Sequence, residues 1–96
     1  MNTMPDSEGF DWGGGNAEKN WERHRVMPVE AEQVFFNSPL LAQADTTHSA
    51  REQRFFVLGQ TDEGRELFVA FTMRMKRIRV ISARDMSRQE RRIYRS

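Results

Sequence analysis

The sequence predicts a single α+β domain in which helices pack on a mainly antiparallel sheet of four or so strands. Two segments with helical spacing come early, segments with strand alternation follow them, and one more helix closes the chain. A length of 96 residues suffices for one compact core. Residues 1–9 mix small, polar and acidic residues without a period, so we expect a flexible extension there and the domain over residues 10–96.

The first segment predicts a short strand and a helix. Apolar and polar residues alternate over residues 10–12, and the glycine triplet 13–15 ends this short strand. Asn16 is a favoured N-cap for a helix that runs to about Arg23 or Arg25. The glycines form either a flexible corner or a phosphate cradle, and they lack the full spacing of a known phosphate-binding motif.

A second helix is expected to begin at Pro28, which suits a first helical turn. Ala31, Val34 and Phe35 then fall on one face at helical spacing. Residues 37–39, Asn-Ser-Pro, end the helix because the residue before a proline disfavours helical backbone.

Strand patterns dominate the middle of the chain. The segments that have them are 40–47, 51–61, 65–74 and 78–83. Residues 46–50 form a polar turn, residues 61–64 give a hairpin signal, and the short basic stretch 74–77 predicts another turn. Segment 65–74 is apolar on both faces, which places it centrally in the sheet. In segment 78–83, Ile78 and Val80 fall on one face of the expected strand, and Arg79 and Ile81 fall on the other.

The last helix is predicted from a capping box. Ser87 and Glu90 have the spacing at which each side chain bonds the other residue's backbone N–H. The helix that begins there carries Ile93 and Tyr94.

Positive charge is concentrated in the last quarter of the chain. Residues 1–48 carry a net charge of −5 and residues 49–96 carry +6, and residues 74–96 hold nine bases against two acids. This asymmetry indicates a polyanionic partner. An arginine-rich end that only keeps the surface solvated is the alternative.

The composition excludes several classes of function. Absence of cysteine excludes disulfides, thiolate metal sites and cysteine nucleophiles. The longest apolar runs, such as 55–58 and 67–71, are far shorter than the roughly 18 residues of a membrane span. The acidic start of the chain does not have the pattern of a signal peptide. We therefore expect a cytoplasmic protein with no membrane partner.

Several short motifs resemble the BrnT toxin family over about Phe10 to Tyr94. The residues that carry the resemblance are Phe10-Asp11-Trp12, Glu18 to His24, Glu30-Ala31, Val34-Phe35, Glu52-x-Arg54-Phe55, Gly59-Gln60-Thr61, and the most specific block, Arg79 to Arg84 with Glu90 and Tyr94. The chain departs from the family at three positions: Gly13 stands where an acid is usual, Arg25 where a glycine is usual, and Pro28 where an aromatic is frequent.

The resemblance implies a RelE-like ribonuclease fold and cleavage of RNA without a metal or another cofactor. It also implies inhibition of translation and growth, and neutralisation by a BrnA-like antitoxin in a heterotetramer of two toxins and two antitoxins. Operator DNA would be contacted only through the antitoxin.

Metal-independent RNA cleavage needs cations on the phosphoryl group, a base for the 2′-hydroxyl and an acid for the leaving 5′-oxygen. Arginine suits the first role because its planar fork matches phosphate oxygens. Arg54, Arg79 and Arg84 come from neighbouring strands of the expected sheet, which favours a group on one face. An ordinary surface or salt-bridged arginine is the alternative for each.

His24, Glu90 and Tyr94 are the acid–base candidates. Histidine titrates near neutral pH, although a single histidine is more often structural. Glu90 and Tyr94 are four residues apart and share a helix face. A capping role for Glu90 and a core-sealing role for Tyr94 are the alternatives. His48 has no visible partner, and the two histidines show no zinc signature.

Further basic residues are expected to bind the RNA backbone: Lys19, Lys76, Arg77, Arg88 and Arg91. Two other functions remain open. One is a non-catalytic nucleic-acid-binding module, although no helix-turn-helix or RNP pattern is present. The other is a protein-interaction module that docks through Phe35 and Phe36.

Overall fold

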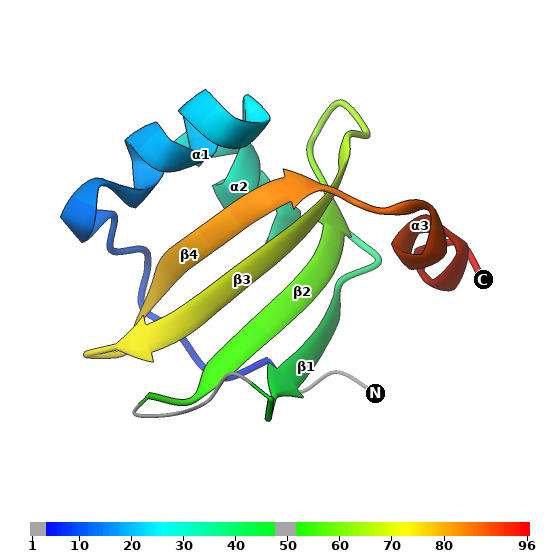
Figure 1. Cartoon of the computed structure of the whole chain (residues 1–96). Helices are drawn as coiled ribbons and strands as arrows, with labels where there is room; N and C mark the ends of the chain where they lie inside the picture. Colours follow the sequence, from blue (N-terminus) through cyan, green and yellow to red (C-terminus); the bar gives the residue numbers. More distant parts are fainter. Residues whose placement is uncertain (1–3, 48–51) are drawn as a thin grey trace.

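The computed structural model describes residues 4–47 and 52–96. Its elements, in chain order, are the 3₁₀ turn η1 (Gly13–Gly15), α1 (Asn16–His24), α2 (Pro28–Val34), β1 (Leu41–Asp45), β2 (Arg54–Gln60), β3 (Glu66–Arg74), β4 (Arg77–Asp85) and α3 (Arg88–Tyr94) (Figure 1). The strands form one sheet in the order β1-β2-β3-β4, and each neighbouring pair is antiparallel. The α+β class with two early helices and one late helix is therefore confirmed. None of the described helices is long and apolar enough to cross a membrane.

One face of the sheet forms the main core with α2. Leu67, Val69 and Phe71 of β3 are fully buried there, as the alternation predicts, and they lie between strands β2 and β4. Ala31 and Val34 of α2 pack into the same core. Burial of such side chains contributes about 1.5–3 kcal/mol each to the stability of the fold.

Helix α1 lies along the outer edge of β4. Asn16 Nδ2 donates to the Val80 carbonyl at 3.0 Å, and the buried Asn20 Oδ1 accepts from the Ala83 N–H at 3.1 Å. These bonds occupy backbone groups that an edge strand would otherwise leave unpaired. Asn16 is thus the first residue of the helix, and the N-cap is Gly15 with a φ of 78°. The prediction of Asn16 as N-cap is wrong, because its side chain donates to the Val80 carbonyl of β4 instead of capping the helix.

The strand predicted over residues 10–12 is reduced to a single bridge. Phe10 pairs with Ile78 in parallel orientation, where Ile78 N donates to Gly9 O and Asp11 N donates to Ile78 O, both at 2.8 Å. Before it, Met4 packs against the core and Glu8 N donates to Lys76 O. The first three residues of the expected extension, and residues 48–50 of the expected 46–50 turn with His48, lie outside the described residues.

Helix α3 covers one end of the opposite face of the sheet (Figure 1). Leu58, Met86 and Tyr94 form a second, smaller core beneath it, against which Phe68 packs. The predicted capping box is present. The rest of this face carries no helix, and we refer to it as the open face.

A β-bulge in β4 decides which side chains reach the open face. Ala70 pairs with Ser82 and Phe71 pairs with Val80, so Ile81 is the extra residue on β4. Strict alternation would put Arg79 and Arg84, which are five residues apart, on opposite faces. With the bulge, both share a face.

Candidate active site

Two arginines flank a threonine in one row across the open face. Arg54 of β2 and Arg79 of β4 both lie directly opposite Thr72 of the central strand β3, and directly opposite residues share a face. Thr72 is buried, and its hydroxyl donates to the Gln53 carbonyl at 2.9 Å. The two guanidinium groups therefore extend from either side of a short, neutral side chain.

The Arg79 side chain reaches the glycine turn before α1. A Cβ atom built on Gly13 would lie only 2.7 Å from Arg79 Nη2. The missing side chain at this position, where the BrnT pattern usually has an acid, thus leaves room for the guanidinium. The Nε atom of Arg79 is buried and has no hydrogen-bond partner in the described structure. A buried guanidinium donor without a partner is costly, so this group is suited to a ligand that accepts hydrogen bonds.

Arg84 lies further along the open face, directly opposite Phe68. Its Nη1 and Nη2 atoms donate to the two Glu90 oxygens at 2.8 and 3.0 Å. The guanidinium carbon lies 4.1 Å from the centre of the Phe68 ring. A fork held by a carboxylate on one side and an aromatic face on the other has a fixed orientation.

Glu90 takes part in the capping box of α3 and also binds Arg84. Its backbone N–H donates to Ser87 Oγ, and its Oε1 accepts from Ser87 N at 2.8 Å, as in a capping box. The hydrogen bond from Arg84 lowers the pKa of Glu90, and burial opposes this shift less strongly. Glu90 therefore stays ionised near neutral pH, which makes it a poor general acid and a good anchor for Arg84.

Tyr94 lies in the core under α3 rather than on the open face. Its side chain is 7 % exposed, and its hydroxyl donates to the Pro39 carbonyl at 2.6 Å. Burial, followed by the nearby Glu66 charge, raises the pKa of Tyr94. The hydroxyl is therefore occupied and points into the protein, which favours the core-sealing alternative for Tyr94 over a catalytic role.

His24 is the last residue of α1, four residues after the buried Asn20, so it faces the far end of β4. There its charge contributes to the lowered pKa of Asp85, the residue after Arg84. The His24 carbonyl accepts from Arg65 Nη2 at 3.2 Å. Within the described residues, the imidazole has no hydrogen bond of its own.

The predicted site residues therefore form two groups. Arg54 and Arg79 lie at one end of the open face, and Arg84 lies with Glu90 at the other. Thr72 and Phe68, the partners of Arg79 and Arg84 on β3, are four residues apart, which corresponds to about 13 Å at a rise of about 3.3 Å per residue. His24 lies at the same end of β4 as Arg84 but near Asp85, which is paired with Leu67 and therefore faces the opposite side of the sheet from Arg84.

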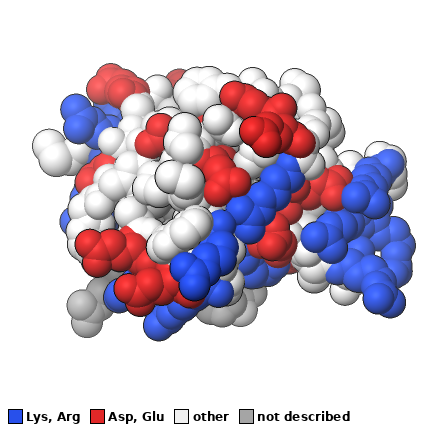
Figure 2. Space-filling view, turned by 90° about the horizontal axis from the view of Figure 1, so that it is seen from above, with Lys and Arg blue, Asp and Glu red and all other residues white. Residues whose placement is uncertain are grey.

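The residues expected to bind the RNA backbone are divided in the same way. Lys76 and Arg77 lie at the β3–β4 turn, Lys19 is exposed on α1, and Arg88 and Arg91 lie on α3. Figure 2 shows the basic side chains of α3 gathered at one end of the molecule. Arg91 lies 3.5 Å from Glu66, which Arg95 also binds. In the described part of the chain, no three His, Cys, Asp or Glu side chains are placed to hold a metal ion.

Sequence reasoning missed two features of the site. Phe68 is the ring beneath the Arg84 guanidinium, and Arg65 ties the end of α1 to Asp85. The signal for Phe68 was its position on the second face of segment 65–74, which alternation alone left without a role. Arg65 had no comparable signal because its partners are distant in sequence.

Residues 12–90 match the model of a family described as the ribonuclease toxin of type II toxin–antitoxin systems. The chain belongs to this family, BrnT, as its motifs predict. Membership implies an RNA target and an antitoxin partner. No curated protein matches the chain in sequence.

Proposed function

We propose that the chain is an endoribonuclease that cleaves RNA on the open face without a metal ion and thereby inhibits translation and growth. The observation that carries the proposal is the β4 bulge, which gives Arg79 and Arg84 the same face as Arg54. Arginines in a row along one face suit a strand of phosphates.

Transesterification is the reaction that needs only such groups. The 2′-oxygen forms a bond to phosphorus as the bond to the 5′-oxygen breaks, a base takes the 2′-hydroxyl proton, and an acid protonates the 5′-oxygen. Arg84, held by Glu90 and Phe68, is assigned to the phosphoryl oxygens of the scissile bond. Arg54 and Arg79 are assigned to a neighbouring phosphate.

His24 is assigned to proton transfer. Of the three acid–base candidates, Tyr94 donates its hydroxyl to Pro39 and Glu90 is held ionised by Arg84. His24 has a side chain free of hydrogen bonds to described residues. It lies at the end of β4 that carries Arg84, beside Asp85, so it would reach the scissile phosphate from the edge of the sheet. Its role is supported by this elimination together with the usual suitability of imidazole.

The antitoxin is proposed to cover the open face. An acidic segment of a BrnA-like partner would complement the positive charge of the open face, and it would supply an acceptor near Arg79, whose buried Nε has no partner among the described residues. We propose a heterotetramer of two toxins and two antitoxins that contacts operator DNA only through the antitoxin.

Cleavage of RNA in the presence of EDTA tests the proposal directly. The wild-type chain should cleave, the double variant Arg79→Ala/Arg84→Ala should not, and His24→Ala should be slower by about 10²-fold or more. The double variant Lys19→Ala/Arg23→Ala removes the same two positive charges from the exposed surface of α1 and serves as the control. RNA binding with no cleavage by the wild-type chain would refute the enzymatic proposal, and loss of activity on addition of EDTA would refute metal independence.

A further inference from the structure

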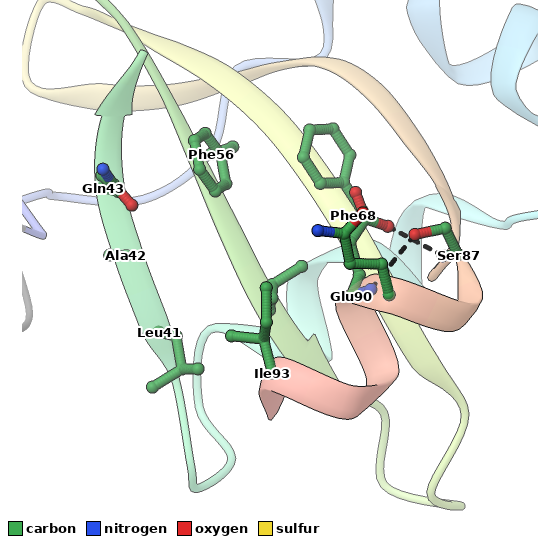
Figure 3. A pocket seen from close by; sticks show the side chains of 10 residues that line it. Leu41, Ala42, Gln43, Phe56, Phe68, Ser87, Glu90 and Ile93 are labelled. Atoms are coloured by element: carbon green, nitrogen blue, oxygen red, sulfur yellow. Dashed lines mark hydrogen bonds between the residues drawn. The ribbon is translucent and has the colours of Figure 1, made fainter. Parts of the chain in front are cut away.

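A cavity of about 450 Å³ lies between α3 and the open face of the sheet (Figure 3). Its lining comes from β1, β2, β3 and α3, and it includes Gln43, Phe56, Phe68, Gln89 and Ile93. This volume falls in the range of about 300–1,000 Å³ that is typical of small-ligand sites. The cavity adjoins Arg84, since Glu90 lines it and Phe68 lies under the Arg84 guanidinium.

Aromatic rings form one wall of the cavity. Phe56 and Phe68 are stacked with centroids 5.4 Å apart and an angle of 23° between the rings. Both rings stand up from the sheet toward the cavity in Figure 3. Leu41 and Ile93, which are 37 % and 53 % exposed, extend the apolar surface. Phe56 and Phe68 are partly exposed, and a partly exposed aromatic surface beside an arginine is the combination on which unpaired bases stack.

Two amide side chains border this apolar surface. Gln43 lies on β1 directly opposite Phe56, and Gln89 lies on the first turn of α3. Both are exposed, and neither side chain makes a hydrogen bond to a described residue. By contrast, the Gln33 side chain accepts from Asp62 N and the Gln60 side chain donates to Ser38 O. The donors and acceptors of Gln43 and Gln89 are thus available to a ligand.

We propose that this cavity is the subsite for an unpaired nucleobase of the RNA substrate. The base lies against Phe56 and Phe68, its edge is read by Gln43 and Gln89, and its sugar–phosphate leads to Arg84. The inference rests on the proposed ribonuclease function and names the part of the substrate that determines sequence preference. A compact cavity with two free amides suits a planar heterocycle better than an amphipathic peptide helix, which requires a long groove.

NMR titration of the full chain with AMP, CMP, GMP and UMP tests the subsite. The side-chain amide signals of Gln43 and Gln89 should shift, and one nucleotide should bind more tightly than the other three. The double variant Gln43→Leu/Gln89→Leu should lose about 10-fold of this discrimination, because base-edge hydrogen bonds carry it. Gln53→Leu is the matched control, since Gln53 is an exposed glutamine that does not line the cavity.

The outcomes separate this subsite from the cleavage proposal. Nucleotide binding at Gln43 and Gln89 in a chain that cleaves no RNA would retain the subsite and refute the ribonuclease proposal. Equal affinities and unshifted amide signals in a chain that does cleave RNA would overturn the subsite alone. Shifts caused only by an acidic antitoxin peptide would also overturn it, because the cavity would then be a protein-docking site.

Discussion

Replacement of Arg65 by methionine should destabilise the fold more than loss of any exposed ion pair. Arg65, in the β2–β3 turn, binds three elements. Its Nε and Nη2 atoms donate to Asp85 of β4 at 2.8 and 3.2 Å, and Nη1 donates to Glu30 of α2 at 3.1 Å. At the end of α1, Nη1 also donates to the Arg25 carbonyl at 2.9 Å and Nη2 donates to the His24 carbonyl. The side chain is 28 % exposed, so water competes only in part for these bonds.

The size of the effect depends on the acceptor groups that lose their hydrogen-bond donor in the variant. The Glu30 and Asp85 carboxylates are 26 % and 53 % exposed and can regain water, whereas the two backbone carbonyls lose a charged donor. Charge-assisted bonds contribute about 1.5–3 kcal/mol each when well shielded and much less at the surface. We therefore expect Arg65→Met to cost about 2–3 kcal/mol, which lowers the Tm of a domain of this size by about 15 °C.

Urea unfolding of the wild type, Arg65→Met and Arg74→Met measures this cost. Arg74 makes one bond of 3.4 Å to Glu52, and both side chains are about half exposed, so its removal should cost less than about 0.5 kcal/mol. If Arg65→Met and Arg74→Met had the same midpoint at an unchanged m-value, the assignment of Arg65 as a structural tie would be refuted.

The same variant has a pH signature. The hydrogen bond from Arg65 is the main cause that lowers the pKa of Asp85. A carboxyl group with a lowered folded-state pKa contributes stability above its unfolded pKa of about 3.9, and this contribution is lost as pH falls through the folded value. The stability difference between wild type and Arg65→Met should therefore shrink below about pH 4. A difference that stays constant from pH 7 to pH 3 would contradict the electrostatic argument.

Three further predictions use the same unfolding measurements. Tyr94→Phe removes the hydrogen bond to Pro39 and should cost about 1 kcal/mol while RNA cleavage stays unchanged; loss of cleavage in a folded variant would restore Tyr94 as a catalytic candidate. Met75 and Lys76 have φ values of 51° and 65°, so the variant Met75→Asn/Lys76→Gly should gain about 1 kcal/mol, and a lower midpoint would contradict this reasoning. Arg84→Met should lower stability at pH 6–7. This loss should shrink as the pH falls below about 4 and disappear only below the lowered folded-state pKa of Glu90, where the carboxyl is protonated in both proteins.

Elements whose determinants are local could be predicted from the sequence. Helix α2 begins at Pro28 as expected and buries Ala31 and Val34, because a first-turn proline and i, i+3 spacing act within a few residues. Helix α3 follows the Ser87–Glu90 capping box for the same reason. The sequence of β3 was sufficient to place it centrally, because apolar side chains on both of its faces must be buried.

Elements that depend on distant partners could not be predicted in this way. Residues 10–12 alternate like a strand, but in the part of the chain that the structure describes their only ladder partner is the edge of β4 at Ile78, which permits one bridge. Asn16 resembles an N-cap, yet its amide is taken by the Val80 carbonyl, 64 residues later in the chain. Local propensity set the approximate start of α1, and tertiary hydrogen bonds decided which residue caps it.

The candidate site shows the same limit in its chemistry. Glu90 and Tyr94 are four residues apart and share a side of α3 in sequence terms, but the carboxylate turns to Arg84 and the hydroxyl turns to Pro39. One faces the open sheet and the other seals the core beneath the helix. Arg79 and Arg84 behave in the opposite way, since their spacing predicts separate faces and the bulge at Ile81 unites them. A single extra residue in an edge strand therefore decides whether the arginines can act on one RNA strand, and its deletion should turn Arg79 away from the open face while β4 remains paired with β3.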